Sequence, residues 1–120
     1  MKIDTMTVSQ LVDLFAANCI DQDRALLYSD IQKFNRLYLR MAAIRDELQR
    51  RPGDQRRALL ELYDHSNAQV RLQAARASLA VAPEAARTLI EVVANSNKFP
   101  QAGDAGMTLD ALDRGIFKPS

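Results

Sequence analysis

The chain has 120 residues, of which 48% are hydrophobic and 26% charged, and its formal net charge is +1. A chain of this size can fold around one core without metal support, and its one cysteine, Cys19, excludes an internal disulfide. No stretch approaches the roughly 18 apolar residues of a membrane span. The N-terminal MKIDTMTVSQ is polar, unlike a signal peptide. We therefore expect a single cytoplasmic domain over residues 1–120.

The first half of the chain predicts two long helices, because apolar residues recur there at steps of three and four. Thr7 is placed to cap the first helix, and Ser29 and Asp30 interrupt the pattern before the second. Pro52-Gly53 ends the second helix. The expected core positions are Val8, Leu11, Val12, Phe15, Cys19 and Leu26, then Ile31, Phe34, Leu37, Tyr38, Met41, Ile44 and Leu48.

Four shorter helices are expected in the second half. Asp54 is placed to cap a third helix from Gln55 to about Asp64, and Ser66 or Asn67 a fourth helix that continues to about Ala82. Pro83 stops that helix and can open a fifth one, which ends near Ala94. A short sixth helix lies near 104–113, and residues 1–6 and 116–120 form terminal tails. Since no segment alternates with strand periodicity, the fold class is all-α.

An internal repeat indicates how these helices are arranged. RALLELYDHSN at 57–67 aligns without gaps to RTLIEVVANSN at 87–97, an offset of 30 residues. Each copy predicts a helix that ends in a polar turn and leads to another helix. A helical hairpin cannot bury its apolar stripe alone, so hairpins stack and cover one another. The chain fits about three stacked hairpins.

Residues 57–83 resemble a HEAT repeat: apolar Leu59, Leu60 and Leu62, a polar turn, and then a Val-Arg pair with two alanines and a leucine. The resemblance implies that the valine and alanines pack between layers. It also implies that Arg71 is structural and bonds to Asp64 or to a backbone carbonyl of the turn. The residues to which it gives structural roles are Val70, Arg71, Ala74, Ala75 and Leu79.

The chain as a whole resembles a small bacterial family of HEAT-like helical domains without an assigned function. Asn35-Arg36, LLELYDHSNAQVRLQAA and FPQAGDAGMTLDAL carry this resemblance, which covers roughly residues 8–117. It implies a right-handed α-α superhelix of the HEAT or armadillo type and no known enzymatic activity. By analogy of fold alone, such proteins sometimes act as immunity partners of bacterial toxins.

The function that we expect is a non-enzymatic protein-interaction module. Stacked hairpins present their second helices on one face, which here are the second, fourth and sixth helices. An acidic or mixed protein partner suits the arginines of that face. The candidate partner-binding residues are Arg36, Arg40, Gln73 and Arg76.

Nucleic-acid binding is the alternative. Residues 33–57 hold eight basic and three acidic residues, a balance of +5, whereas residues 1–32 hold two and five, a balance of −3. A basic segment can meet phosphates. However, no aromatic stacking platform accompanies these cations, and the whole chain is nearly neutral.

The sequence offers little for catalysis, and we expect neither an enzyme nor a cofactor. His65 is the only histidine, and it falls in a turn, whereas Cys19 falls on an apolar helical stripe. Zinc sites use three or four His or Cys ligands, more than the chain has. GDAG at 103–106 lacks the lysine of a phosphate loop, although N–H groups at the start of a helix there could hold an anion.

Overall fold

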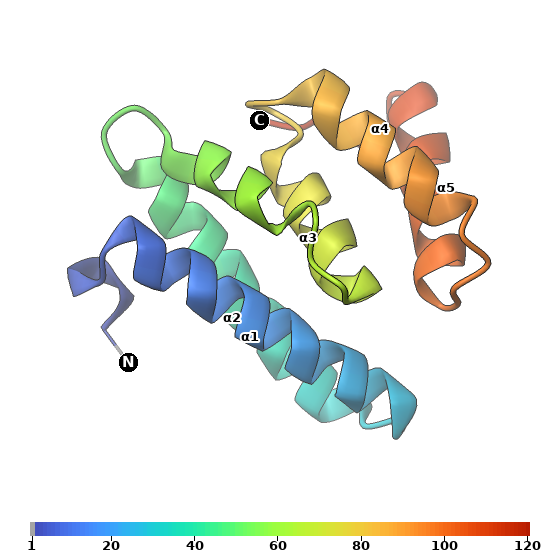
Figure 1. Cartoon of the computed structure of the whole chain (residues 1–120), viewed down its shortest axis with the longest axis horizontal. Helices are drawn as coiled ribbons and strands as arrows, with labels where there is room; N and C mark the ends of the chain where they lie inside the picture. The colour runs from blue at the N-terminus through green and yellow to red at the C-terminus, as the bar shows by residue number, and fades with distance from the viewer. Residues whose placement is uncertain (1) are drawn as a thin grey trace. The chain divides into compact units, whose positions relative to one another are not determined.

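The protein is described by a computed structural model that covers residues 2–120 (Figure 1). Over this range it contains five α-helices, two 3-10 helices and no strand, which confirms the all-α prediction. The chain forms two compact units: the first ends at Ala58, and the second is Leu59–Ser120. A single stack over the whole chain stays a prediction.

The first unit is a long helical hairpin preceded by a short 3-10 helix, η1, at Ile3–Thr5. Helices α1 (Val8–Leu27) and α2 (Ile31–Arg50) pack side by side (Figure 1). Thr7 caps α1 as predicted, through a reciprocal pair of hydrogen bonds with Gln10. Asp30 caps α2 by accepting a bond from the Lys33 backbone N–H at 3.1 Å. The turn between the helices is therefore fixed by local polar chemistry.

The predicted apolar faces of α1 and α2 are largely buried. Cys19 lies in the core of the first unit with its Sγ 3.7 Å from the Sδ of Met41. Burial raises the pKa of the Cys19 thiol far above its ordinary range, so the thiol stays protonated and inert. One expected core position is wrong: Ile31 is 60% exposed, because it is the first residue of α2 and stands at the end of the hairpin.

The segment that links the units is not the α-helix that the sequence predicts. It is a 3-10 helix, η2, over Gln55–Leu62. Asp54 has a φ of 54°, and its carboxylate binds Arg56 through the backbone N–H at 3.3 Å and the guanidinium at 2.9 and 2.7 Å. The Asp54 carboxylate therefore binds Arg56 at the start of this 3-10 helix and does not cap an α-helix.

The second unit contains α3 (Ala68–Ser78), α4 (Pro83–Ala94) and α5 (Gln101–Asp113). Asn67 caps α3 by accepting from two backbone N–H groups, and Pro83 opens α4 as predicted. Helix α3 ends four residues before the predicted Ala82. At that end, Ser78 Oγ donates to the Ala74 carbonyl at 2.7 Å.

The core of the second unit is built by α3, α4 and α5. Phe117 packs against it and is half-buried, so the C-terminal tail docks on the unit at this residue, whereas Ile116 is exposed. The N-terminal tail is also partly ordered, as the 3-10 helix η1. The buried core cluster consists of Leu72, Ala75, Leu79, Ala86, Ile90, Val93 and Ala105.

The residues to which the HEAT resemblance gives structural roles lie in and around α3. Val70, Ala74, Ala75 and Leu79 are all buried. Arg71 Nη1 donates to the backbone carbonyls of the preceding turn, at 2.7 Å to residue 65 and 3.2 Å to residue 66. Of the two expected partners, the arginine thus binds the turn carbonyls. It holds the turn closed, which is a structural role.

Candidate functional site

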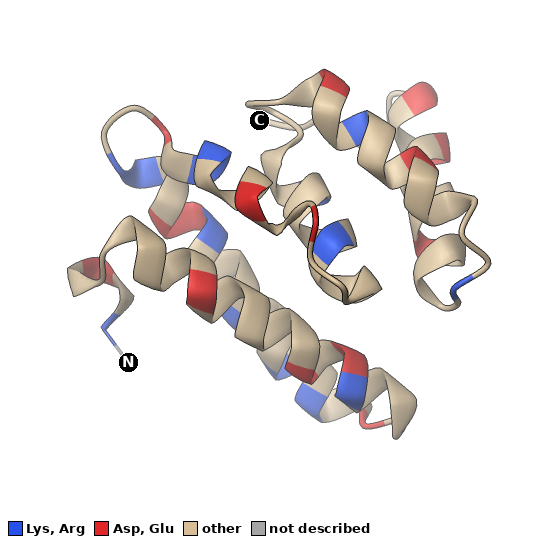
Figure 2. Cartoon of the chain, in the orientation of Figure 1, with Lys and Arg blue, Asp and Glu red and all other residues tan. Residues whose placement is uncertain are grey.

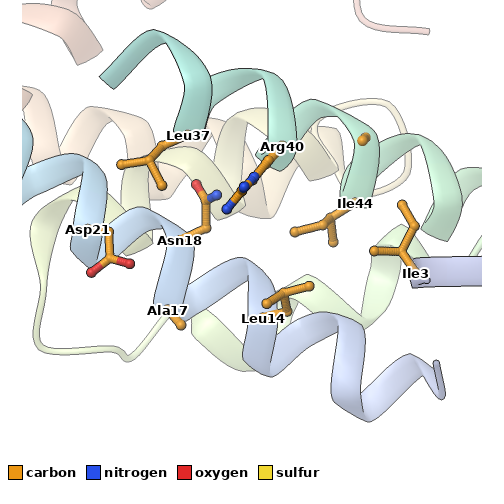
Figure 3. A pocket seen from close by; sticks show the side chains of 9 residues that line it. Ile3, Leu14, Ala17, Asn18, Asp21, Leu37, Arg40 and Ile44 are labelled. Carbon is orange, nitrogen blue, oxygen red and sulfur yellow. The ribbon is translucent and has the colours of Figure 1, made fainter. Parts of the chain in front are cut away.

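The candidate site is a pocket between α1 and α2 (Figure 3), with a volume of about 550 Å³. Two buried side chains of α2, Leu37 and Ile44, form part of its wall. Polar groups come from both helices, since Arg40 belongs to α2 and Asn18 to α1. The pocket therefore combines an apolar surface with a few polar groups, as ligand sites do. Its lining residues are Ile3, Leu14, Ala17, Asn18, Asp21, Leu37, Arg40, Ala43 and Ile44.

Asn18 is fixed in the pocket wall by a buried partner. Asn18 is only 7% exposed, and its side-chain oxygen, Oδ1, accepts a hydrogen bond from Gln22 Nε2 at 2.7 Å. The amide nitrogen of Asn18 is therefore left on the other side, where it faces the guanidinium of Arg40 in Figure 3. Two hydrogen-bond donors thus point at the same space.

One end of the pocket is held by Arg51. Its Nη2 donates to the carbonyl oxygens of Ile3 at 3.2 Å and of Met6 at 2.7 Å, and so fixes the segment that brings Ile3 to the pocket. Its Nε donates to Glu47 Oε2 at 2.6 Å, and Arg50 bonds the other oxygen of this carboxylate. These bonds, from Arg51 first and Arg50 second, hold the pKa of Glu47 below its ordinary value.

The cations of the first unit divide into two groups. Most arginines of this unit that follow residue 44 form ion pairs with carboxylates nearby in the sequence: Arg45 binds Asp46, and Arg56 binds Asp54. In contrast, the exposed side chains of Lys33, Arg36 and Arg40 make no hydrogen bond or ion pair with any of residues 2–120.

Helical spacing gathers these three cations on one side of α2, because they are three and four residues apart. Figure 2 shows the Lys and Arg positions of α2 in blue. Arg40 also lines the pocket. The pocket thus has an unneutralised cationic edge.

The four predicted partner-binding residues do not share one open surface. Arg36 and Arg40 are exposed on α2 as expected. Arg76 is half-buried and forms an ion pair with Asp104 at 3.5 Å. The expected exposure of Gln73 is wrong, since this residue is only 2% exposed. The reason is that α3 is buried on nearly every side and has no open face.

Sequence reasoning missed Asn18, a buried polar residue that α1 contributes to the pocket. A signal was present, because Asn18 and Gln22 interrupt the apolar stripe of α1 four residues apart, where side chains meet. A buried polar pair on such a stripe needs internal hydrogen bonds, and here the Gln22 amide donates one to the Asn18 side-chain oxygen.

Neither His65 nor Cys19 lines the pocket. His65 is in the turn before α3, where its Nδ1 accepts from the Asn67 backbone N–H at 3.0 Å. Among residues 2–120, no three His, Cys, Asp or Glu side chains come together as metal ligands. The GDAG segment is not a loop before a helix, as α5 begins at Gln101, and Asp104 brings a negative charge to its first turn. Over the same residues, no helix combines the length and the apolar content that crossing a bilayer requires.

Comparison with known proteins places the chain in a family. The crystal structure of the protein RPA1889 from Rhodopseudomonas palustris CGA009 matches it with a TM-score of 0.96 and 55% sequence identity, covering 100% of this chain and 99% of that one. No curated protein matches the sequence. The family model described as a domain of unknown function (DUF2019) matches residues 9–113. The chain therefore belongs to the DUF2019 family of domains of unknown function.

Proposed function

We propose that this protein is a non-enzymatic protein-interaction module that binds an acidic partner along α2. Arg36 and Arg40 are the contacts to which we give the largest roles, with Lys33 beside them. The observation that carries the proposal is that these exposed cations have no carboxylate partner within residues 2–120, whereas most of the arginines after them along the chain do.

Physical chemistry supports a protein as the occupant of this surface. Arginine binds carboxylates with two parallel hydrogen bonds and is enriched at the energetic centres of protein interfaces. Apolar side chains stand exposed at the adjoining end of the hairpin, where Leu27 and Tyr28 are 77% and 74% exposed and Ile31 follows. An exposed apolar group beside unpaired arginines is the composition that interfaces favour.

The HEAT-like reading of the fold belongs to the same proposal. Its support is local: the Val70-Arg71 pair with buried Ala74 and Ala75, and an arginine that bonds to turn carbonyls. Helical-repeat proteins act mainly as binding scaffolds. An immunity-type partner of a bacterial toxin is one form that such a binding role would take.

Nucleic-acid binding through residues 33–57 is the alternative, and the ion pairs weigh against it. Arg45, Arg50, Arg51 and Arg56 all bind carboxylates of this same segment. Their charges are therefore already compensated, so fewer counterions would be released on contact with phosphates. The three cations that stay unpaired form a short row, which suits a protein carboxylate cluster better than a long phosphate backbone.

The test is an affinity capture from lysate of the protein's own host, with nuclease treatment, using the wild type and Arg36→Gln/Arg40→Gln. If each arginine contributes about 1 kcal/mol, the double variant binds its partner about 30-fold more weakly. Arg24→Gln/Arg114→Gln is the control for the loss of two positive charges, because both side chains are well exposed and neither belongs to α2.

A protein captured in stoichiometric amount, resistant to nuclease and lost only in the first double variant, would support the proposal. Nucleic acid alone, released as salt rises, would favour the alternative. A protein captured equally by both double variants would refute the assignment of the site to α2.

A further inference from the structure

We propose that the pocket between α1 and α2 binds a small carboxylate with an unbranched aliphatic tail. The carboxylate would lie between Asn18 and Arg40, and the tail would run along the apolar wall. This small molecule would bind inside the pocket, whereas the protein partner proposed above would bind the exposed cations of α2.

The polar end of the pocket is built for an anion. Asn18 Oδ1 is occupied by Gln22, so its amide group can only donate towards the pocket. No fully enclosed side-chain nitrogen or oxygen in residues 2–120 lacks a hydrogen-bond partner, so this unbonded nitrogen must open onto accessible space. Arg40 is also only a donor, and it has no carboxylate partner there. Two donors that face one another can share one acceptor, and a negative charge on that acceptor strengthens both bonds.

The rest of the pocket is built for an aliphatic chain. From the Asn18–Arg40 pair, Figure 3 shows Leu14, Ile44 and Ile3 on one side and Asp21 on the other. The tail would follow the apolar side, because an aliphatic chain beside Asp21 would remove water from this charged carboxylate, which forms an ion pair with Arg24 at 3.8 Å. A volume of about 550 Å³ lies within the usual range of small-molecule sites.

The geometry also limits the length of the tail. Asn18 and Leu14 are one helical turn apart on α1, about 6 Å, and Ile3 continues the wall beyond Leu14. With C–C bonds of about 1.5 Å, an extended alkyl chain advances about 1.3 Å per bond, so about five bonds cover this turn and a chain of about six to eight carbons reaches past Leu14 along the wall that Ile3 continues. Octanoate is therefore a suitable probe, and the carboxylate and the tail should both be needed for binding.

The first experiment titrates the isotope-labelled full-length protein with octanoate below its micelle concentration and follows backbone amide shifts by NMR. We expect saturable shifts centred on Leu14, Asn18 and Ile44, with weak or no shifts from acetate, which lacks the tail. Octylamine, which has the tail and the opposite charge, should not bind. No saturable shift at these residues, or equal binding of octylamine, would overturn the proposal.

The second experiment uses three variants. Arg40→Gln should weaken octanoate binding about ten- to hundredfold, since a hydrogen bond to a charged group is lost. Asn18→Asp keeps the acceptor for Gln22 but removes the donor, and should do the same. Arg36→Gln is the control, because it removes an equally exposed cation of α2 that does not line the pocket.

The comparison of variants decides between this site and general charge attraction. Loss of octanoate binding in Arg40→Gln with retention in Arg36→Gln supports the pocket. Equal weakening in both overturns it, because the anion would then be held by the charge of α2 alone. Capture of the protein partner proposed above needs neither Asn18 nor a free aliphatic acid, so the two proposals can fail independently.

Discussion

Truncating one side chain of α4 tests the packing of the second unit. Ile90 is fully buried in the core cluster with Leu72 and Ala105. Ile90→Ala removes three carbons, which at about 0.8 kcal/mol per buried methylene is about 2.4 kcal/mol of transfer free energy. The cavity left behind adds to this, so we expect a loss of about 3–4 kcal/mol in the free energy of unfolding.

Val92 provides the matched control, since it lies on the same helix two residues away and is 57% exposed. Val92→Ala should change the free energy of unfolding by less than about 0.5 kcal/mol. Both changes replace a β-branched residue by alanine in a helix, so the gain in helix propensity largely cancels between them. Urea unfolding followed by circular dichroism measures both. Equal losses would refute the assignment of the inward face of α4.

Two further predictions concern polar contacts. Arg71→Met should lower the free energy of unfolding by about 1–2 kcal/mol in urea titrations, because the bonds to the carbonyls of residues 65 and 66 are lost; unchanged stability would mean that water replaces the guanidinium. The pKa values of Glu47 and Asp54 are lowered in the folded protein, so their contribution is complete above the ordinary values of 4.5 and 3.8 and is lost as the pH falls through the folded values. We therefore expect the wild-type Tm to fall on acidification below pH 4.5 and the fall to be shallower in Glu47→Gln, whereas parallel curves would contradict this role for Glu47.

Local signals in the sequence were enough to place most of the helices. Thr7, Asp30, Asn67 and Pro83 each start a helix through a contact or a constraint within a few residues, so the chain alone predicts them. The HEAT resemblance implied that Arg71 binds Asp64 or a turn carbonyl, and the carbonyls that it binds are five and six residues away along the chain.

Features that depend on contacts between segments far apart in the sequence were not predictable in this way. Gln73 was expected on an open face because the second helices of stacked hairpins present one, yet the structure buries it. The pocket likewise depends on the register between α1 and α2, which sets Asn18 opposite Arg40. No periodicity within one helix contains that information. The type of η2 also escaped prediction, because Asp54 binds Arg56 instead of starting an α-helix.

The enclosure of α3 restricts how this protein can change through evolution. Seven of its 11 residues are buried, including two glutamines and a serine. A larger residue at Ala74 or Ala75 would clash with the surrounding core. Gln101 Nε2 donates a hydrogen bond to Gln69 Oε1 at 3.0 Å, and an apolar residue at position 69 would remove this acceptor. Most substitutions in α3 should therefore be removed by selection, whereas the exposed positions of α2 can change more freely. Across the DUF2019 family, we expect the sequence of α3 to vary less than these exposed positions of α2.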